Sequence, residues 1–292
     1  MTLEFGRIIT AMATPFDHNG DVNYSEAIRL AQHLYDTGSD AIVLAGTTGE
    51  SPTLTHDEEF QLFKTIRDAF PTKKIIAGTG SNCTRTAVES TREAADLGVD
   101  GVLQVVPYYN RPSQEGCYQH FKAVAEATDL PVILYNIPGR TGRNLEPETI
   151  ARLAEIPTII GIKESAGSVD QAQKIRDVTP AEFIIYSGDD GLTLDFMECG
   201  AVGVVSVAAH IVGKQMAEMI AAFVAGDKDK ARQIETELKP VFDVLFITSN
   251  PTPLKAALTI SGFNVGQPRL PLVPATEAEV AQIENIIRQL KA

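Results

Sequence analysis

The sequence contains no tryptophan, only three cysteines and only five histidines, so it has few of the residues that bind metals. Cys83, Cys117 and Cys199 are odd in number and far apart, which excludes a Cys-x-x-Cys metal site and favours a reducing, cytosolic compartment. The histidines form no HExxH motif and no i, i+4 pair. A histidine-ligated metal is therefore not expected.

Positive charge is also scarce, because 25 Lys and Arg stand against 38 Asp and Glu, giving a net charge of −13. Affinity for nucleic acid comes mainly from clustered Lys and Arg, and the sequence has no such cluster. No stretch approaches the roughly 20 apolar residues of a membrane span, and the first 16 residues lack the profile of a signal peptide. We expect a cytoplasmic globular protein with no nucleic-acid or membrane partner.

Short apolar runs rich in β-branched residues recur through the first two thirds of the chain and predict eight strands. They begin near Arg7, Asp40, Lys73, Asp100, Leu130, Pro157, Glu182 and Ala201. Segments with helical periodicity lie between them: Tyr24–Thr37, His56–Ala69, Thr84–Leu97, Ser113–Ala127, Glu146–Glu155, Val169–Val178 and Leu192–Cys199. Strand–helix steps of about 25 to 35 residues are typical of a parallel sheet covered by helices.

Eight such units favour the α/β class and a closed (β/α)8 TIM barrel over residues 1–210. An open doubly wound sheet is the alternative, but no GxGxxG motif follows any predicted strand. After Ala209 the pattern changes to helical segments alone: Lys214–Ala225, Lys228–Phe246, Thr252–Ile260 and an amphipathic segment from Glu277. Residues 211–292 are therefore predicted to form a helical C-terminal region.

The working residues of a TIM barrel lie at the C-terminal ends of its strands, and Lys163 is the most informative of these. It lies in the segment GIKES, where the strand alternation places Ile159, Gly161 and Lys163 on one face. Removal from water disfavours the charged form of an amine, so a lysine in the barrel interior would attack a carbonyl group as a neutral nucleophile. Gly161 is expected to leave room for its side chain. The alternative is a structural lysine paired with a carboxylate such as Asp189.

Two further strand ends, those of the second and fifth strands, carry suitable polar groups. Tyr135 ends the neighbouring strand, within reach of the lysine amine, and its hydroxyl could pass protons. Thr47 and Thr48 lie in a turn whose backbone N–H groups suit a carboxylate or phosphate. Arg140 offers a planar fork of donors that matches a carboxylate. Taken singly, each could equally be a core tyrosine, an ordinary tight turn or a surface arginine, so the argument rests on their joint occurrence.

Six segments resemble the signature segments of the dihydrodipicolinate synthase family, within the N-acetylneuraminate lyase superfamily of class I aldolases. They are AMATPF at Ala11, AGTTGESPTL at Ala45, IAGTGSN at Ile76, PYYNRPSQEG at Pro107, YNIPGRTG at Tyr135 and GIKES at Gly161. The match covers the whole chain. It implies a Schiff-base lyase that joins pyruvate to L-aspartate 4-semialdehyde, the first committed step towards diaminopimelate and lysine. It also implies a homotetramer, built as a dimer of dimers, with no metal and no organic cofactor.

The resemblance further implies a role for each of seven residues. The catalytic residues are the Schiff-base lysine Lys163, the proton donor Tyr135, and the relay residues Thr47 and Tyr109. The substrate-binding residues are Thr48 and the main chain at Val205 for pyruvate, and Arg140 for the carboxylate of the semialdehyde. Tyr109 is expected to reach across a dimer interface into the partner's site.

An inhibitory lysine site at the dimer interface is the second site that the resemblance implies. Ser51, His56, Asn82 and Tyr108 match it, but Glu59 and Thr86 stand where lysine-sensitive members carry a histidine and a glutamate. A cationic effector needs carboxylates placed against its ammonium groups. Feedback by lysine is therefore expected to be weak or absent.

Three alternative functions remain open. Lys163 and Tyr135 would also serve a Schiff-base lyase acting on sialic acid or a 2-keto-3-deoxy sugar acid, although Arg140 and the Tyr109 segment favour the synthase. A non-catalytic binding barrel would be expected to have lost part of the site. A cofactor-dependent barrel would need a basic or glycine-rich phosphate site after the seventh and eighth strands. The segment SGDDG, Ser187 to Gly191, is acidic and argues against it.

Overall fold

The computed structural model describes residues 3–290 and contains all eight predicted strands. They are β1 Ile8–Ala11, β2 Ala41–Leu44, β3 Lys74–Gly78, β4 Gly101–Val105, β5 Val132–Asn136, β6 Ile159–Glu164, β7 Ile184–Ser187 and β8 Gly203–Ser206. Hydrogen-bonded neighbours follow the order of the chain and close into a barrel. The predicted (β/α)8 TIM barrel is confirmed.

The helices also follow the predicted pattern, with most ends within about two residues of the expected ones. They are α1 Tyr24–Asp36, α2 His56–Ala69, α3 Thr84–Asp96, α4 Gln114–Ala125, α5 Pro138–Thr141, α6 Pro147–Leu153, α7 Val169–Val178, α8 Thr193–Glu198, α9 Ala209–Val224, α10 Lys228–Val244, α11 Thr252–Ile260 and α12 Glu277–Gln289. Helix α9 begins at Ala209 rather than Lys214, because a first turn precedes a kink at Val212. The short α5 was not predicted, since four residues are too few to show a helical period.

Local capping explains two of the helix starts. The Thr55 side chain accepts a hydrogen bond from the Glu58 backbone N–H, and the Glu58 carboxylate accepts one from Thr55 N, which is a complete capping box at α2. The Ser113 hydroxyl accepts a hydrogen bond from Gly116 N at the start of α4. These contacts satisfy backbone donors that have no partner inside the helix.

The chain divides into two compact units, and each is described by itself. The mid-chain unit holds residues 3–7 and Lys74–Val205, and the terminal unit holds Ile8–Lys73 and the residues from Ser206 onward. The predicted division into a barrel at 1–210 and a helical region at 211–292 remains a prediction. Among residues 3–290, no helix is both long enough and apolar enough to cross a membrane.

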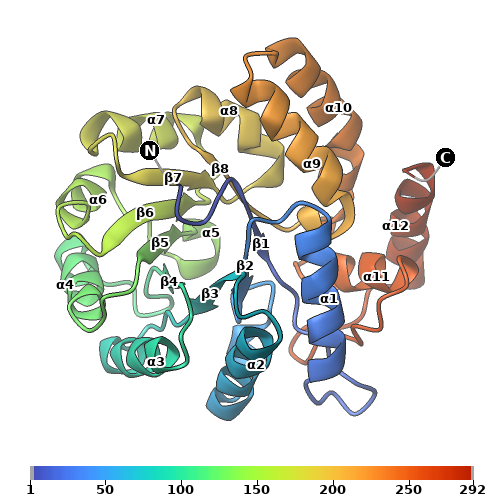
Figure 1. Ribbon diagram of the computed structural model, residues 1–292, viewed down its shortest axis with the longest axis horizontal. Coiled ribbons are helices and arrows are strands. Elements are labelled where there is room, and N and C mark those ends of the chain that lie inside the picture. Colours follow the sequence, from blue (N-terminus) through green and yellow to red (C-terminus); the bar gives the residue numbers. More distant parts are fainter. Residues whose placement is uncertain (1–2, 291–292) are drawn as a thin grey trace. The chain divides into compact units, whose positions relative to one another are not determined.

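In the mid-chain unit, the strands from β3 to β8 pair in parallel, and Figure 1 shows α3, α4, α6 and α7 along their outer side. Gly161 allows β6 to approach β7, because a Cβ at this position would lie 2.3 Å from the Ile184 carbonyl oxygen. Gly161 therefore has a role in strand packing, and its expected role of leaving room for Lys163 stays a prediction. The glycine that borders the Lys163 side chain is Gly188, whose Cβ would lie 3.0 Å from Lys163 Cε.

In the terminal unit, β1 and β2 pair in parallel, and buried His210 in α9 binds the segment that follows β1. The His210 Nε2 atom accepts a hydrogen bond from Ala13 N (3.1 Å), and Nδ1 lies 2.8 Å from the Val207 carbonyl oxygen. Burial lowers the pKa of His210 to about 4, so the ring is neutral at physiological pH and can accept at one nitrogen while donating at the other. This histidine is a structural residue.

Candidate active site

Lys163 and Tyr135 lie side by side at the ends of two neighbouring strands. The β5–β6 register pairs the two residues directly, and the Lys163 amine lies 4.3 Å from the centre of the Tyr135 ring. Each residue is only 5% exposed. The structure therefore brings together, in an enclosed position, the lysine and the tyrosine that the sequence singled out.

Two lysines are buried among the described residues, and their surroundings differ. Lys255 lies 2.6 Å from the Glu50 carboxylate, with both side chains 1% exposed. Lys163 has no carboxylate within ion-pair distance in the described part of the chain, and the Asp189 carboxylate instead accepts a hydrogen bond from Gly191 N. The alternative, a structural ion pair between Lys163 and Asp189, is therefore wrong. A buried amine without a counter-ion is unusual in a structural role and suits a nucleophile.

Ser165 adds a hydroxyl next to the lysine that sequence reasoning missed. The point where a Cβ on Gly188 would stand is 1.7 Å from Ser165 Oγ and 3.0 Å from Lys163 Cε, so both groups border the space that this glycine leaves open. The Ser165 Oγ atom is buried and has no hydrogen-bond partner among the described residues. The signal in the sequence was Gly188, directly after β7, because a glycine at a strand end often marks a place where another group lies close to the backbone.

A polar network on the opposite face fixes the ends of β5 and β6. The fully buried Glu164 carboxylate accepts hydrogen bonds from Asn136 Nδ2 (2.9 Å), Gln171 Nε2 (3.1 Å) and Ala166 N (2.6 Å). Burial raises the pKa of Glu164, and these hydrogen bonds oppose that shift. Since Asn136 and Glu164 directly follow Tyr135 and Lys163, the network holds the two strand ends in register. Sequence reasoning did not find this network, although an apolar strand that ends in a carboxylate is its signal.

The loop after β4 carries Tyr109 in an unusual conformation. Tyr109 is 89% exposed, with φ at +73°, and Arg111 follows with φ at +45°. The backbone N–H of Tyr109 donates to the Thr141 carbonyl oxygen (3.3 Å), and this hydrogen bond joins the tyrosine loop to the loop that carries Arg140. Left-handed backbone at non-glycine residues is strained and persists only where other contacts hold it.

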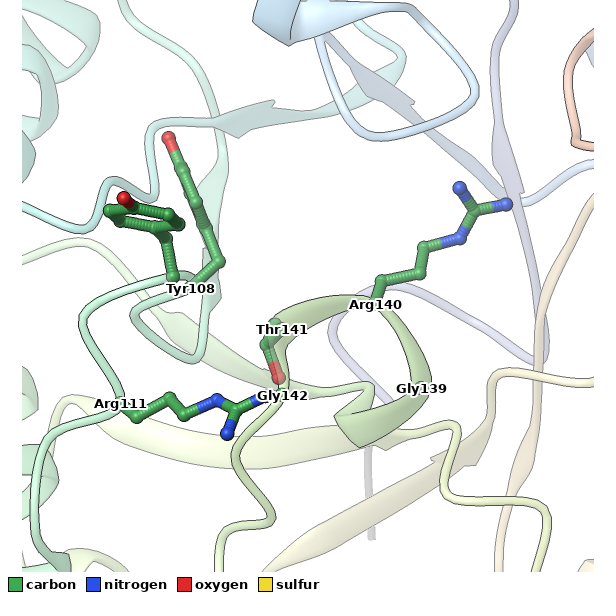
Figure 2. Close-up of a pocket in the computed structure, with 7 residues that line it drawn as sticks. Tyr108, Arg111, Gly139, Arg140, Thr141 and Gly142 are labelled. Carbon is green, nitrogen blue, oxygen red and sulfur yellow. The ribbon is translucent and has the colours of Figure 1, made fainter.

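The two loops border a cavity of about 790 Å³ that contains the predicted carboxylate-binding arginine. It is lined by Tyr108, Tyr109, Arg111, Gly139, Arg140, Thr141 and Gly142. In Figure 2 the Arg111 side chain points to Gly142, whereas the Arg140 guanidinium points away from Tyr108. Arg140 thus lines the same cavity as Tyr108 and Tyr109, although its guanidinium is not directed at Tyr108. Val205 lies separately, at the end of β8, with its side chain 1% exposed.

Thr47 and Thr48 belong to the terminal unit, in the turn after β2. Thr48 is 2% exposed, and its hydroxyl oxygen accepts a hydrogen bond from Asn250 Nδ2 (2.8 Å). The turn closes through a backbone hydrogen bond from Glu50 N to Thr47 O. It is a tight turn, as predicted, and its contacts within the terminal unit make it rigid.

The residues predicted for a lysine effector site fall in both units. In the terminal unit, burial raises the pKa of Glu59 to about 7, while a hydrogen bond with Ser51 and the charge of His56 oppose the shift. In the mid-chain unit, Asn110 Nδ2 donates to the Asn82 carbonyl oxygen (2.8 Å), next to the 38%-exposed Tyr108. The effector site as a whole stays a prediction.

No three His, Cys, Asp or Glu side chains lie together as a metal-ion site within residues 3–290.

Known proteins resemble the chain over nearly all of its length. Residues 4–290 match the model of the dihydrodipicolinate synthetase family. A 4-hydroxy-tetrahydrodipicolinate synthase of Cyanothece sp. (strain PCC 7425) is 58% identical over 288 residues, covering 98% of either chain. One from Desulforamulus reducens is 53% identical over 291 residues, covering 99% of this chain and 98% of the relative.

Solved structures agree with these relatives. A dihydrodipicolinate synthase of Bacillus anthracis has a TM-score of 0.96 at 48% identity, covering 98% of this chain and 99% of that one. The enzyme of Cyanidioschyzon merolae, solved with lysine bound, has a TM-score of 0.97 at 47% identity and 98% coverage of both chains. The chain belongs to the dihydrodipicolinate synthetase family.

Proposed function

We propose that this chain is a 4-hydroxy-tetrahydrodipicolinate synthase, which condenses pyruvate with L-aspartate 4-semialdehyde through an imine on Lys163. The observation that carries the proposal is the buried Lys163 amine, which has no carboxylate partner among the described residues and lies 4.3 Å from the Tyr135 ring. The family of this chain supports the same reaction, since relatives named for this activity are 53 to 58% identical to it.

The first half of the reaction uses the lysine as a nucleophile. The Lys163 nitrogen adds to the C2 carbonyl carbon of pyruvate, and the resulting carbinolamine loses its hydroxyl group as water when Tyr135 supplies a proton. The product is an imine, with Thr47 and Tyr109 proposed to complete the proton relay. The imine then accepts the electron pair of a methyl C–H bond when that proton leaves, which gives an enamine without a metal or organic cofactor.

The second half forms the carbon–carbon bond. The enamine carbon adds to the aldehyde carbon of the semialdehyde, whose oxygen takes up a proton and becomes the 4-hydroxyl group. The amino group of the same substrate then attacks the imine carbon and displaces Lys163, closing the ring and restoring the free amine. In this proposal Thr48 and the Val205 main chain hold the pyruvate part, and Arg140 pairs with the carboxylate of the semialdehyde.

The working form is proposed to be a homotetramer, a dimer of dimers, in the cytoplasm. Tyr109 supports an interface at the tyrosine loop, because a ring that is 89% exposed on strained backbone contributes little to a single chain. The unpaired set of three cysteines fits a reducing compartment.

Trapping with borohydride tests the proposal. The protein is incubated with pyruvate and sodium borohydride, and peptide mass spectrometry is expected to find the reduced adduct on Lys163. Turnover is then compared between L-aspartate 4-semialdehyde and sugar aldehydes. Fast turnover with a sugar aldehyde and none with the semialdehyde would favour the sugar-acid lyase instead, and the absence of any adduct would favour a binding barrel.

Arg140→Ala is expected to raise the KM for the semialdehyde by about 10- to 100-fold, the range of a lost hydrogen-bonded charge pair, while the pyruvate adduct still forms. Steady-state kinetics and adduct yield measure the two effects. Arg152→Ala is the charge-matched control, since Arg152 pairs with Glu115 on the surface of α6 (2.9 Å) and should leave both values unchanged. An equal loss of pyruvate adduct in Arg140→Ala contradicts the assigned role.

Lysine is expected to inhibit weakly or not at all, although a relative from Cyanidioschyzon merolae was solved with lysine bound. With a pKa near 7, Glu59 is only partly ionised at neutral pH, which weakens its attraction for an ammonium group. Because the carboxylate gains charge above pH 7, any inhibition should strengthen from pH 6 to pH 8. Initial rates with up to millimolar lysine measure this. Strong inhibition at sub-millimolar lysine would contradict it.

A further inference from the structure

The turn that carries Thr47 and Thr48 is fixed by buried polar groups from residues 250–269 of the same unit. Lys255 Nζ lies 2.6 Å from Glu50 Oε1, and Arg269 N donates to Glu50 Oε2 (2.9 Å). The Thr14 hydroxyl donates to the Gly49 carbonyl oxygen (2.7 Å). These contacts hold Glu50 in a left-handed conformation, with φ at +58°. The backbone of the turn is therefore anchored without help from a ligand.

The Glu50–Lys255 pair is a strong anchor because it is enclosed. Both side chains are 1% exposed, and the Lys255 ammonium also lies over the Phe16 ring, 3.8 Å from its centre. Burial lowers the pKa of Lys255 to about 8, and the Glu50 carboxylate opposes this shift, so the ammonium stays mostly charged at neutral pH. Removing either partner would leave a buried charge without compensation, which makes this pair unsuitable as a mild probe of the turn.

Asn250 differs from Lys255 and Arg269, because it contacts the Thr48 side chain and they contact Glu50. Its Nδ2 atom donates to Thr48 Oγ1 at 2.8 Å, and the two residues are 4% and 2% exposed. A threonine hydroxyl carries one proton and two lone pairs. When the Asn250 amide occupies one lone pair of the Thr48 hydroxyl, the hydroxyl proton is directed to another acceptor. Water has little access to this buried hydroxyl and so competes little for its proton.

We infer that Asn250 is a positioning residue that fixes the Thr48 hydroxyl as a hydrogen-bond donor for the carboxylate of pyruvate. The inference rests on the proposed function, in which Thr48 contacts that carboxylate. Donors are needed there, because the protein carries a net charge of −13 and its substrate is an anion. A chain of two hydrogen bonds, from amide to hydroxyl to carboxylate, also strengthens each member by polarisation.

Asn250→Asp is the sharpest test, since it keeps the size of the side chain but replaces the amide donor with a carboxylate. Once ionised, the introduced carboxylate can only accept, so the Thr48 proton turns to it and is lost to pyruvate. We expect the KM for pyruvate to rise about 10- to 100-fold and the KM for the semialdehyde to stay within about twofold. At lower pH the introduced group is protonated and becomes a donor again, so the ratio of the variant's pyruvate KM to that of the wild type should fall.

Two companion variants separate positioning from a purely structural role. In a Thr48→Val background, the effect of Asn250→Asp on the pyruvate KM should largely disappear, because the residue through which it acts is gone. Should Asn250→Asp fail to fold, Asn250→Ala is expected to raise the pyruvate KM by about 3- to 10-fold, as for the loss of a neutral hydrogen bond. Thermal melting is recorded for each variant.

The outcomes discriminate between the inference and the function on which it rests. An Asn250→Asp enzyme that binds pyruvate as tightly as the wild type, or that loses both substrates equally without recovery at low pH, overturns the inference alone. A wild-type protein that forms no borohydride-trapped adduct overturns the proposed function and the inference with it. A selective, pH-reversible loss of pyruvate that depends on Thr48 supports the inference.

Discussion

Replacing Lys163 with alanine is expected to abolish imine formation and with it all detectable turnover. The reaction has no other route, because the enamine nucleophile exists only while pyruvate is bonded to an amine, and Lys163 is the buried lysine of the described chain that lacks a carboxylate partner. Borohydride trapping followed by peptide mass spectrometry should find no adduct on the variant. Adduct formation at an undiminished rate on another lysine would contradict the assignment of Lys163.

Stability separates this loss from unfolding. Removing Lys163 leaves no buried carboxylate unpaired, so the variant should melt close to the wild type. Lys255→Met is the contrast, because it strands the buried Glu50 carboxylate and is expected to cost about 3 to 5 kcal/mol of unfolding free energy. A Lys163→Ala protein that is destabilised as strongly as Lys255→Met would point to a structural Lys163.

Tyr135→Phe is expected to slow imine formation by roughly 10²-fold or more, the usual contribution of a positioned acid or base. The change removes the hydroxyl but keeps the ring beside the Lys163 amine, so the position of the lysine should be retained. Quenched-flow mixing with pyruvate, with borohydride as the quench, measures the rate of imine formation. The rate of imine formation that remains in Tyr135→Phe would come from proton transfer by Thr47.

Tyr186→Phe is the matched control for Tyr135→Phe. Tyr186 is the partner of Lys163 on the other side, in the β6–β7 register, and is also buried. Its hydroxyl donates to the Gly6 carbonyl oxygen (2.8 Å), so its loss should cost about 1 kcal/mol of stability and leave the imine rate unchanged. If both variants slow the imine equally, the hydroxyl of Tyr135 has no special role.

Much of the fold could be predicted because its signals are local. Each strand is a short apolar run and each helix a periodic one, and Thr55 and Ser113 cap their helices through residues only three positions away. The predicted neighbours Lys163 and Tyr135 follow from the same logic, since consecutive strands pair in parallel with their ends together. The roles of Thr47, Tyr109 and Val205 rest on family resemblance and remain predictions.

The parts that were missed depend on contacts between residues far apart in the sequence. The close approach of Gly161 to the Ile184 carbonyl was not foreseen, because only the β6–β7 register reveals it. Ser165 was not considered, because the space it shares with Gly188 is formed by two strand ends. Asn250 follows no motif and lies 202 residues from Thr48.

The sequence by itself determined the alternation of strands and helices, the barrel class and the lysine at the end of the sixth strand, because hydrophobic periodicity and residue type encode these locally. The tertiary structure alone decided which polar groups are satisfied. Among the residues that the structure describes, it gave Lys255 a carboxylate and left Lys163 without one, and it directed the Asn250 amide to the Thr48 hydroxyl. The physical reason is that burial makes an unmet charge or hydrogen bond costly, and its partner is chosen by distance in space and not by distance along the chain.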